Sequence, residues 1–250
     1  MLSPVLGVTG KAAALLGFAS ACLLVLGGCG GPSAAAPGGL TVGQHGPTTT
    51  PVPDVPDAWT PDRSGNVIYL TFDDGPGKFT PVVLDILKEN DAKATFFEIG
   101  QLIRTREALA QRVLDEGHMI GDHTWNHSAL ARLSKAQIRR QLATTAQAIG
   151  PKMGPCMRPP YGSIDGKVRE TSKSMGMTPI LWTNDTHDFA RKTTAAEIGK
   201  ALENLTAGAV VLMHDGGGDR TRTMAALKEA LPKLKAKGFT FETIPACRPL

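Results

Sequence analysis

The chain has 250 residues, of which 42% are hydrophobic and 20% charged, and it carries a formal net charge of +4. This length allows one large α/β domain or two small ones, and the apolar fraction is ordinary for a globular protein. The mild positive charge comes without blocks of lysine and arginine and without interleaved aromatic residues, so it argues against nucleic-acid binding. Anionic cell-wall polymers are compatible partners, although the charge does not demand them.

The first thirty residues are predicted to lie outside the globular fold. Lys11 is followed by an almost wholly apolar run over residues 12–26, which is typical of a secretion signal and short for a permanent membrane span. The run ends in Leu-Gly-Gly before Cys29, which resembles the lipobox of bacterial lipoproteins, in which the cysteine is lipid-modified. We therefore expect a signal peptide over residues 1–29 with lipidation at Cys29. An ordinary cleaved signal with an incidental cysteine is the alternative.

Residues 30–65 are rich in Pro, Gly, Thr, Ser and Ala and have almost no apolar periodicity. Such a segment cannot bury enough surface to offset the entropy lost on ordering, so we interpret it as a tether. Composition changes sharply at Asn66, and residues 66–250 are predicted to form the folded domain. In an exported protein, the cysteines of this domain, Cys156 and Cys247, predict a disulfide, with two separate buried thiols as the alternative.

The folded segment alternates seven strand signals with six helix signals. Short apolar or β-branched runs of the kind seen in buried parallel strands span residues 67–72, 94–99, 119–123, 156–158, 178–182, 209–213 and 239–244. Caps and stops mark the helices, which are expected at residues 82–90, 107–116, 134–149, 167–175, 194–205 and from about 221 onward, with Pro232 kinking the last. This alternation predicts a parallel sheet, either open or closed into a barrel.

Polar clusters follow five of these strands, at the carboxyl ends where the sites of parallel α/β folds lie. They are Asp73-Asp74, His123 with His127, residues 158–162, residues 184–188 and His214-Asp215. Chance placement would not put five clusters at one edge of a sheet. We therefore expect these side chains to surround one functional site.

The first two clusters are suited to a hydrolytic metal site. Two histidines four residues apart, His123 and His127, lie on one face of a helical turn, so both imidazoles can reach one ion. A carboxylate from elsewhere completes three ligands with an open position for water, and the second carboxylate of the Asp73-Asp74 pair is left as a base. Taken singly, Asp-Asp-Gly is more often a turn that closes a strand, and a His-x-x-x-His pair is as often a surface pair.

Five motifs in order resemble the polysaccharide deacetylase family, which is carbohydrate esterase family 4 and is also called the NodB homology domain. They read TFDDG at residues 71–75, HTWNH at 123–127, RPPYG at 158–162, DTHDF at 185–189 and LMH at 212–214. The resemblance extends over residues 67–244. It implies an α/β fold in the form of a deformed (β/α) barrel with about seven parallel strands, an incomplete TIM-type barrel.

The resemblance also implies roles for the motif residues. A divalent metal, usually zinc, is held by Asp74, His123 and His127, and cobalt or nickel can substitute at such a site. Asp73 is the general base and is oriented by Arg158. Three residues of later motifs complete the catalytic set, namely the general acid His214, its tuning partner Asp188, and Tyr161, whose backbone N–H helps to hold the oxyanion.

Three further residues are expected to shape the substrate pocket. Phe189 stands where the family usually has Trp, so it offers an apolar wall for an acetyl methyl group but no indole N–H. Leu212 is core by its pattern, and the resemblance implies that it shapes the acetyl pocket beside Phe189. Trp125 is expected either to stack on a sugar ring or to pack beneath the metal-binding loop.

These expectations describe an exported, metal-dependent N-deacetylase that acts on an N-acetylglucosamine polymer, with peptidoglycan favoured. The alternatives are deacetylation of chitooligosaccharides, O-deacetylation of acetylxylan, and a carbohydrate-binding lipoprotein without activity. The expected partners are the N-acetylated polysaccharide and, through the lipid anchor, the membrane that faces the cell wall. If the lipobox is not used, the protein is expected to be secreted. No nucleic-acid partner is expected, and the chain is expected to be a monomer.

Overall fold

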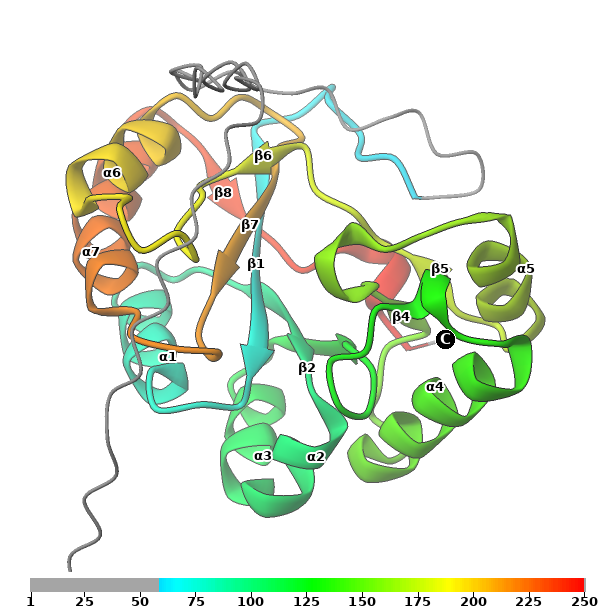
Figure 1. Ribbon diagram of the computed structural model, residues 1–250. Helices are drawn as coiled ribbons and strands as arrows, with labels where there is room; N and C mark the ends of the chain where they lie inside the picture. Colours follow the sequence, from blue (N-terminus) through cyan, green and yellow to red (C-terminus); the bar gives the residue numbers. More distant parts are fainter. Residues whose placement is uncertain (1–58, 250) are drawn as a thin grey trace, which may run out of the picture. The chain divides into compact units, whose positions relative to one another are not determined.

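The computed structural model describes residues 59–249, which form a sheet of parallel strands covered by helices (Figure 1). The predicted signal peptide, Cys29 and most of the predicted tether lie outside these residues. Within residues 59–249, no helix combines the length and the apolarity needed to cross a membrane.

The described part of the chain has eight strands. Four longer ones form the centre of the sheet, namely β1 (Val67–Gly75), β2 (Ala94–Glu98), β3 (Met119–Asp122) and β7 (Val210–His214). Four two-residue strands complete it, namely β4 (Cys156–Met157), β5 (Thr178–Pro179), β6 (Asn184–Asp185) and β8 (Thr240–Phe241). The order is β5-β4-β3-β2-β1-β7-β6, with β8 beside β1, and every pair is parallel. All seven predicted strands are present, and β6 is an eighth that has no apolar pattern to reveal it.

The two ends of this strand order, β5 and β6, are joined by only four residues, 180–183. Ile180 donates its N–H to the carbonyl of Met157 in β4 at 2.8 Å, whereas Thr183 donates its N–H to the carbonyl of Val210 in β7 at 2.9 Å. The chain therefore crosses from one edge of the curved sheet to the other without a ladder between β5 and β6. This crossing segment closes the deformed barrel that the motifs imply.

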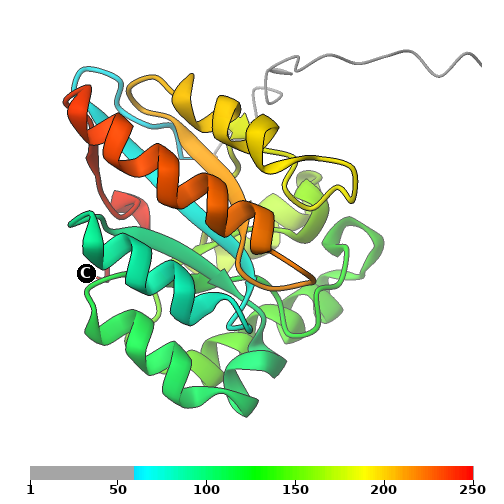
Figure 2. The same ribbon diagram turned by 90° about the vertical axis from the view of Figure 1, so that its left-hand side faces the viewer.

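Among the described residues, seven α-helices lie outside the sheet. They are α1 (Thr80–Glu89), α2 (Gly100–Thr105), α3 (Glu107–Asp115), α4 (Lys135–Ile149), α5 (Gly166–Ser174), α6 (Ala195–Glu203) and α7 (Thr221–Ala236). Figure 2 shows α6, α7 and α1 side by side over one face of the sheet. Ser134 and Thr194 form capping boxes at the starts of α4 and α6, where the sequence predicts helices to begin. The six-residue α2 was not predicted because it is too short for a periodic pattern.

Side chains of β1 alternate between two hydrophobic clusters. Ile68, Leu70 and Phe72 pack outward with residues of the surrounding helices, whereas Tyr69 belongs to a separate cluster inside the barrel. Successive residues of a strand point to opposite faces, so Asp73 shares the inward face with Tyr69. The sheet thus delivers a carboxylate into the barrel at the carboxyl end of its central strand.

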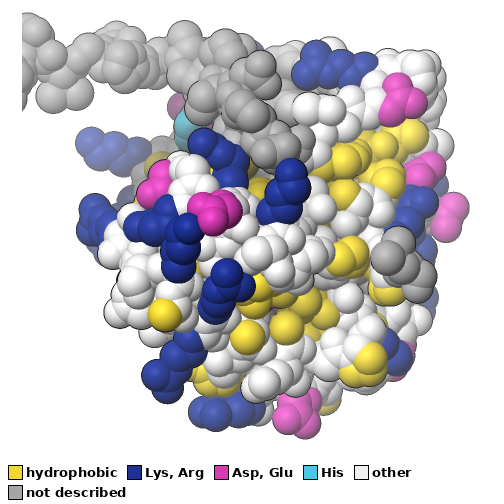
Figure 3. Space-filling model, turned by 90° about the vertical axis from the view of Figure 1, so that its right-hand side faces the viewer, with side chains coloured by type: hydrophobic (Ala, Val, Ile, Leu, Met, Phe, Trp, Pro, Cys, Tyr) yellow, Lys and Arg dark blue, Asp and Glu magenta, His cyan; other side chains and the backbone are white. Residues whose placement is uncertain are grey.

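Lysine and arginine gather on the face formed by α4 and α5 (Figure 3). Residues 124–184 contain two acidic residues, Asp165 and Glu170, which already pair with Lys167 and Lys135. Eight basic residues besides the buried Arg158 occur in the same stretch, namely Arg132, Lys135, Arg139, Arg140, Lys152, Lys167, Arg169 and Lys173. This face is complementary in charge to an anionic polymer.

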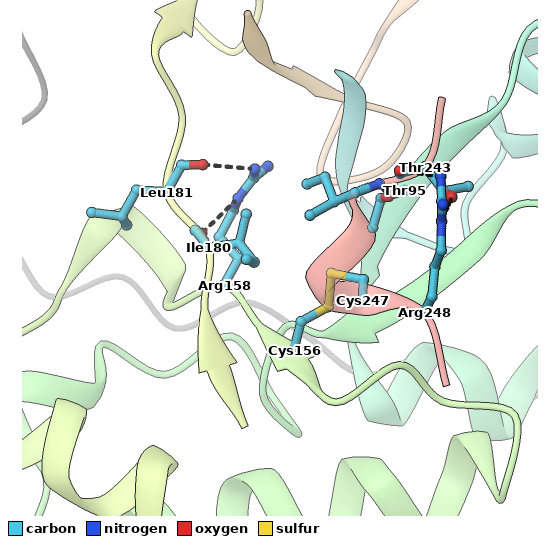
Figure 4. The surroundings of a disulfide bond; sticks show 9 residues. Thr95, Cys156, Arg158, Ile180, Leu181, Thr243, Cys247 and Arg248 are labelled. Atoms are coloured by element: carbon cyan, nitrogen blue, oxygen red, sulfur yellow. Dashed lines mark hydrogen bonds between the residues drawn. A yellow bond between two sulfur atoms is a disulfide. The ribbon is translucent and has the colours of Figure 1, made fainter. Parts of the chain in front are cut away.

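A disulfide joins Cys156 of β4 to Cys247 near the end of the chain, as predicted (Figure 4). Both cysteines are fully buried. The two segments pack so closely that a β-carbon on Gly154 would overlap the carbonyl of Cys247. The bond therefore fastens the C-terminal segment to the short strand that directly precedes Arg158.

Loss of this disulfide is expected to destabilise the fold, because the crosslink spans 91 positions of sequence. In the chain-entropy description, a loop of this size contributes about 4.6 kcal/mol to the free energy of unfolding. Denaturant unfolding of the oxidised protein and of the Cys156→Ala/Cys247→Ala double variant measures the difference. Equal unfolding midpoints, or alkylation of both thiols without a reductant, would contradict this expectation.

Candidate active site

The predicted polar residues meet at the carboxyl ends of β1, β3, β4 and β7. Asp73 and Asp74 lie near the end of β1, His123 directly follows β3, and Arg158 directly follows β4. His214 ends β7 and is paired in register with Asp73 across the β1–β7 ladder. The structure thus brings these residues together at one end of the barrel.

Asp74, His123 and His127 form a cluster of metal-ligand type. Their ligand atoms all lie within 4.8 Å of one another. Oδ1 of Asp74 is 3.1 Å from Nε2 of His127 and 3.5 Å from Nε2 of His123. A carboxylate and two imidazoles leave one position open in the tetrahedral geometry of zinc.

The second nitrogen of each histidine is engaged away from this cluster. Nδ1 of His123 lies 2.8 Å from the carbonyl oxygen of Arg158, which can only accept, so Nδ1 carries a proton and Nε2 is the nitrogen left for a ligand bond. Nδ1 of His127 lies 3.0 Å from the hydroxyl of Tyr161. Among the described residues, the buried Oδ1 of Asp74 has no hydrogen-bond partner. Imidazoles that are oriented through Nδ1 and an unpartnered carboxylate oxygen fit the divalent ion that the motifs imply.

The two histidines do not share a helical turn, which corrects the expectation from their spacing. Residues 123–129 form a loop in which Thr124 and His127 have φ angles of +68° and +61°. Oδ1 of Asp122 accepts the N–H of Thr124, and Oε1 of Gln141 in α4 accepts the next two backbone N–H groups. The imidazoles therefore converge through tight left-handed turns held by side chains, and not through the periodicity of a helix.

Arg158 is fully buried inside the barrel and fixes Asp73. Its Nη1 donates to Oδ1 of Asp73 at 2.8 Å and to Oγ1 of Thr71 at 2.7 Å. Nε and Nη2 donate to the carbonyls of residues 180–181, the segment that closes the barrel (Figure 4). Burial lowers the pKa of Arg158, and the charge of Asp73 opposes that shift. The other carboxylate oxygen of Asp73 lies 3.8 Å from Nε2 of His123, so an oriented carboxylate borders the ligand cluster.

His214 is paired with Asp188, as the motifs imply. Nδ1 of His214 lies 2.7 Å from Oδ1 of Asp188, whose Oδ2 accepts the N–H of His214 and the hydroxyl of Thr223, each at 2.9 Å. Burial alone would lower the pKa of His214, but the hydrogen bond and charge of Asp188 outweigh burial and raise it above its usual value. His214 is thus an imidazole that can hold and release a proton, on the strand next to that of Asp73.

Exposed aromatic rings flank the cluster. The Phe189 ring, 51% exposed, lies 5.7 Å from the ring of His214. The Tyr161 ring, 74% exposed, lies 4.6 Å from the ring of His127, and its backbone has a φ of +60°. Leu212 is buried in β7, two residues before His214. These positions are compatible with the expected pocket role of Phe189 and Leu212.

Trp125 packs against α2, which agrees with the second of its two expected roles. The guanidinium of Arg104 lies 5.0 Å from its ring. A β-carbon on Gly100 would come within 2.6 Å of the same ring, so glycine is needed there. These contacts fasten the loop of residues 123–129, to which Trp125 belongs, to α2. They do not bring the Trp125 ring next to Phe189 or Leu212.

Three carboxyl groups beneath the site are fully buried, namely Glu98, Asp122 and Asp215. Within the described residues, both side-chain oxygens of Glu98 and one each of Asp122 and Asp215 have no hydrogen-bond partner. Burial raises the pKa of all three, that of Asp215 to about 7. Sequence reasoning missed Glu98 and Asp122 and gave Asp215 no role, because a charged residue at the end of a strand is normally taken to face solvent.

Glu98→Gln is expected to change how stability depends on pH. Full burial raises the pKa of Glu98 well above its usual 4.5, and repulsion from Asp215 adds to the shift. Above pH 4.5 the folded state therefore binds more protons than the unfolded state, so the stability of the parent protein falls as pH rises. The variant lacks this contribution, and its stability relative to the parent should increase from about pH 5 to about pH 8. Urea unfolding across this range measures the two slopes, and parallel slopes would exclude the assignment.

An oriented carboxylate beside a triad of metal ligands, with a protonable imidazole on the neighbouring strand, fits the class of metal-dependent hydrolases built on α/β barrels. Residues 60–180 match the model of a family described as polysaccharide deacetylase. The peptidoglycan-N-acetylglucosamine deacetylase of Bacillus cereus (strain ATCC 14579) is 37% identical over 191 residues, which cover 74% of this chain and 90% of that protein. The chain belongs to the polysaccharide deacetylase family.

A second relative and a solved structure agree with this membership. Peptidoglycan-N-acetylglucosamine deacetylase PgdA of Listeria monocytogenes serotype 1/2a (strain 10403S) is 40% identical over 202 residues, which cover 79% of this chain. The match spans only 41% of the length of that relative. The crystal structure of the Bc1960 peptidoglycan N-acetylglucosamine deacetylase superposes with a TM-score of 0.71 at 33% identity, covering 76% of this chain and 92% of that one.

Proposed function

We propose that this protein is a metal-dependent hydrolase that removes N-acetyl groups from an N-acetylglucosamine-containing polysaccharide, with peptidoglycan as the favoured substrate. The observation that carries the proposal is the placement of Asp73 and His214 in register on neighbouring strands beside the ligand cluster, each held by a buried partner, Arg158 for Asp73 and Asp188 for His214. The names of the Listeria and Bacillus relatives support the choice of polymer.

The reaction that suits this site is hydrolysis of an acetamide, which has a weakly electrophilic carbonyl and a poor leaving group. When bound by Asp74, His123 and His127, a divalent ion such as zinc supplies Lewis acidity and lowers the pKa of water to about 7. Asp73 accepts the proton of the attacking water. The backbone N–H of Tyr161 is the donor that we assign to the developing oxyanion, a kind of contact whose loss costs about 2.7–4 kcal/mol of transition-state stabilisation.

The departing amine must be protonated, and we assign this step to His214. Its raised pKa keeps the ring charged to higher pH than an isolated imidazole. Asp188 holds the proton on Nδ1, so the proton that is delivered comes from Nε2. Phe189 and Leu212 are proposed to bound the acetyl group, and the basic face of α4 and α5 would favour an anionic wall polymer over a neutral one.

Acetate release tests this proposal and separates it from its alternatives. Peptidoglycan, chitooligosaccharides and acetylxylan are compared side by side, with and without a chelator and with zinc, cobalt or nickel restored. We expect peptidoglycan to give the fastest release and the chelator to abolish it. Faster release from chitooligosaccharides or acetylxylan would identify that polymer as the substrate. Binding of a polymer without acetate release from any of them would indicate a carbohydrate-binding protein without activity. Full activity in a metal-free preparation would exclude the mechanism.

We also propose that the mature chain is lipid-anchored at Cys29 and acts as a monomer on the outer side of the membrane. Cys29→Ala should then release the protein from the detergent phase into the aqueous phase, because one acyl modification site is lost. Fractionation of membranes and medium, with the parent protein as the control, measures the change. If the variant stays with the membrane, an uncleaved signal segment is the anchor. If the parent protein is already soluble, the lipobox is not used.

A further inference from the structure

A glycine loop, defined here as residues 216–217, lies directly against the Asp74 ligand. A β-carbon on Gly216 would overlap the carbonyl oxygen of Asp74, and a β-carbon on Gly217 would overlap its Oδ2. The N–H groups of Asp215 and Gly216 donate to the carbonyl of Asp73 at 3.2 and 3.4 Å. No residue larger than glycine fits at either loop position without moving the ligand.

This support matters because the backbone of Asp74 has a φ of +71°. Residues other than glycine are uncommon in that conformation, and they stay in it when the surrounding structure holds them there. The glycine loop supplies that constraint on the side of Oδ2. His123 and His127 lie on the other side of the carboxylate, near Oδ1. The direction of Oδ1 toward the two imidazoles therefore depends on where the glycine loop lies.

Arg220 fixes the glycine loop. It is 5% exposed, and its Nε donates to the carbonyl of Gly216 at 2.8 Å. Its Nη1 donates to the carbonyl of Asp188 at 3.3 Å. One buried guanidinium thus bridges the loop behind the ligand Asp74 and the segment that orients His214.

We propose that Arg220 is a positioning residue, a clamp that holds the glycine loop against Asp74 and fixes the position of that loop relative to Asp188. This inference rests on the proposed function, in which Asp74 binds the metal and Asp188 orients the acid. Arginine suits the task because its planar fork can donate to two carbonyls from different segments, whereas a lysine ammonium cannot reproduce that fork. The role therefore depends on geometry and not on positive charge alone.

Arg220→Lys separates geometry from charge, and Arg222→Lys is its matched control. Arg222 lies in the first turn of α7, two residues after Arg220, and also donates to backbone carbonyls, those of residues 190, 191 and 193, whereas its side-chain bonds do not reach the glycine loop. Titration of the metal-free proteins with Co²⁺ should show affinity about 10–100-fold weaker for Arg220→Lys, the usual effect of changing a contact behind a ligand, and an altered absorption spectrum of the bound ion. Arg222→Lys should match the parent protein. An unchanged affinity and spectrum for Arg220→Lys would overturn the proposal.

Gly217→Ala and Gly218→Ala give a second test that does not require the arginine variant to fold. Both positions have positive φ, +69° and +153°, so alanine is strained at either. Only the β-carbon at Gly217 meets Asp74, whereas the nearest atoms to one at Gly218 belong to Arg220 at 3.9 Å or more. We expect weaker Co²⁺ binding for Gly217→Ala alone. Equal losses of Co²⁺ affinity in both variants would show that backbone strain alone weakens binding, and this would overturn the proposed role of Arg220.

Acetate release by the same proteins distinguishes failure of the clamp from failure of the proposed function. If the clamp is correct, Arg220→Lys should lower kcat with little change in KM, because it moves a ligand and the acid but touches no substrate. A loss that appears in KM alone would contradict this. If the parent protein releases no acetate while the Co²⁺ results hold, the clamp stands and the proposed function fails.

Discussion

Asp73→Asn is expected to retain the metal ion and to lose about 10²–10⁴-fold in turnover, the usual contribution of general acid–base catalysis. Asn has nearly the same shape but cannot accept the proton of the attacking water. Oδ1 of Asp73 bonds to Arg158 at 2.8 Å, and Oδ2 lies 3.8 Å from His123, so the ligand cluster does not depend on this carboxylate. Asp73→Asn should therefore impair catalysis without impairing metal binding.

Asp74→Asn is the matched partner of that variant and should behave in the opposite way. Oδ1 of Asp74 lies between the two imidazoles, so the amide removes a charged ligand and weakens metal binding. Metal content after dialysis and acetate release at saturating metal, measured on both variants, decide between the roles. If Asp73→Asn loses the ion while Asp74→Asn keeps it, the assignment of ligand and base is reversed. If both lose the ion, Asp73 is also a ligand.

The fold and the position of the site could be predicted because strand periodicity and topology act over whole segments. β1 shows this most clearly, since its near-continuous apolar run marks a strand buried on both faces. The carboxyl end of a parallel strand is also the place where a site forms, so Asp73 and Asp74 could be located from pattern alone. The pairing of Cys156 with Cys247 followed from export and from the number of cysteines left in the domain.

Local backbone geometry could not be predicted, and it decides how the ligands converge. The spacing of His123 and His127 indicated a helical turn, but hydrogen bonds from Asp122 and Gln141 stabilise a loop with two positive φ angles. Residue spacing does not encode such side-chain contacts, because Gln141 comes from another element. Arg220 was missed for the same reason, since its partners are carbonyls of segments that meet only in the folded chain.

His214→Ala is expected to retain the metal and to lower amide hydrolysis by about 10²–10⁴-fold. Hydrolysis of an ester of similar size should fall less, because an alkoxide leaves more readily than an unprotonated amine. His187→Asn is the matched control, since His187 is exposed in the same loop as Asp188, its side chain pairs with Asp185 and not with His214, and its φ of +52° is one that Asn tolerates. This control should leave both activities nearly unchanged. Equal losses of amide and ester hydrolysis in His214→Ala would assign the ring to substrate binding.

The pH dependence of kcat/KM on the amide tests the same assignment in a second way. The raised pKa of His214 keeps the ring protonated to higher pH, so activity that needs the proton is full below that pKa and is lost as pH rises through it. Asp188→Asn removes the charge that raises this pKa, and the alkaline limb of the profile should therefore move to lower pH. The alkaline limb for ester hydrolysis should be shallower than that for the amide, because an ester's leaving group needs the proton less. An alkaline limb that stays in place in Asp188→Asn would show that another group sets it, and His214 would then lose the role of general acid.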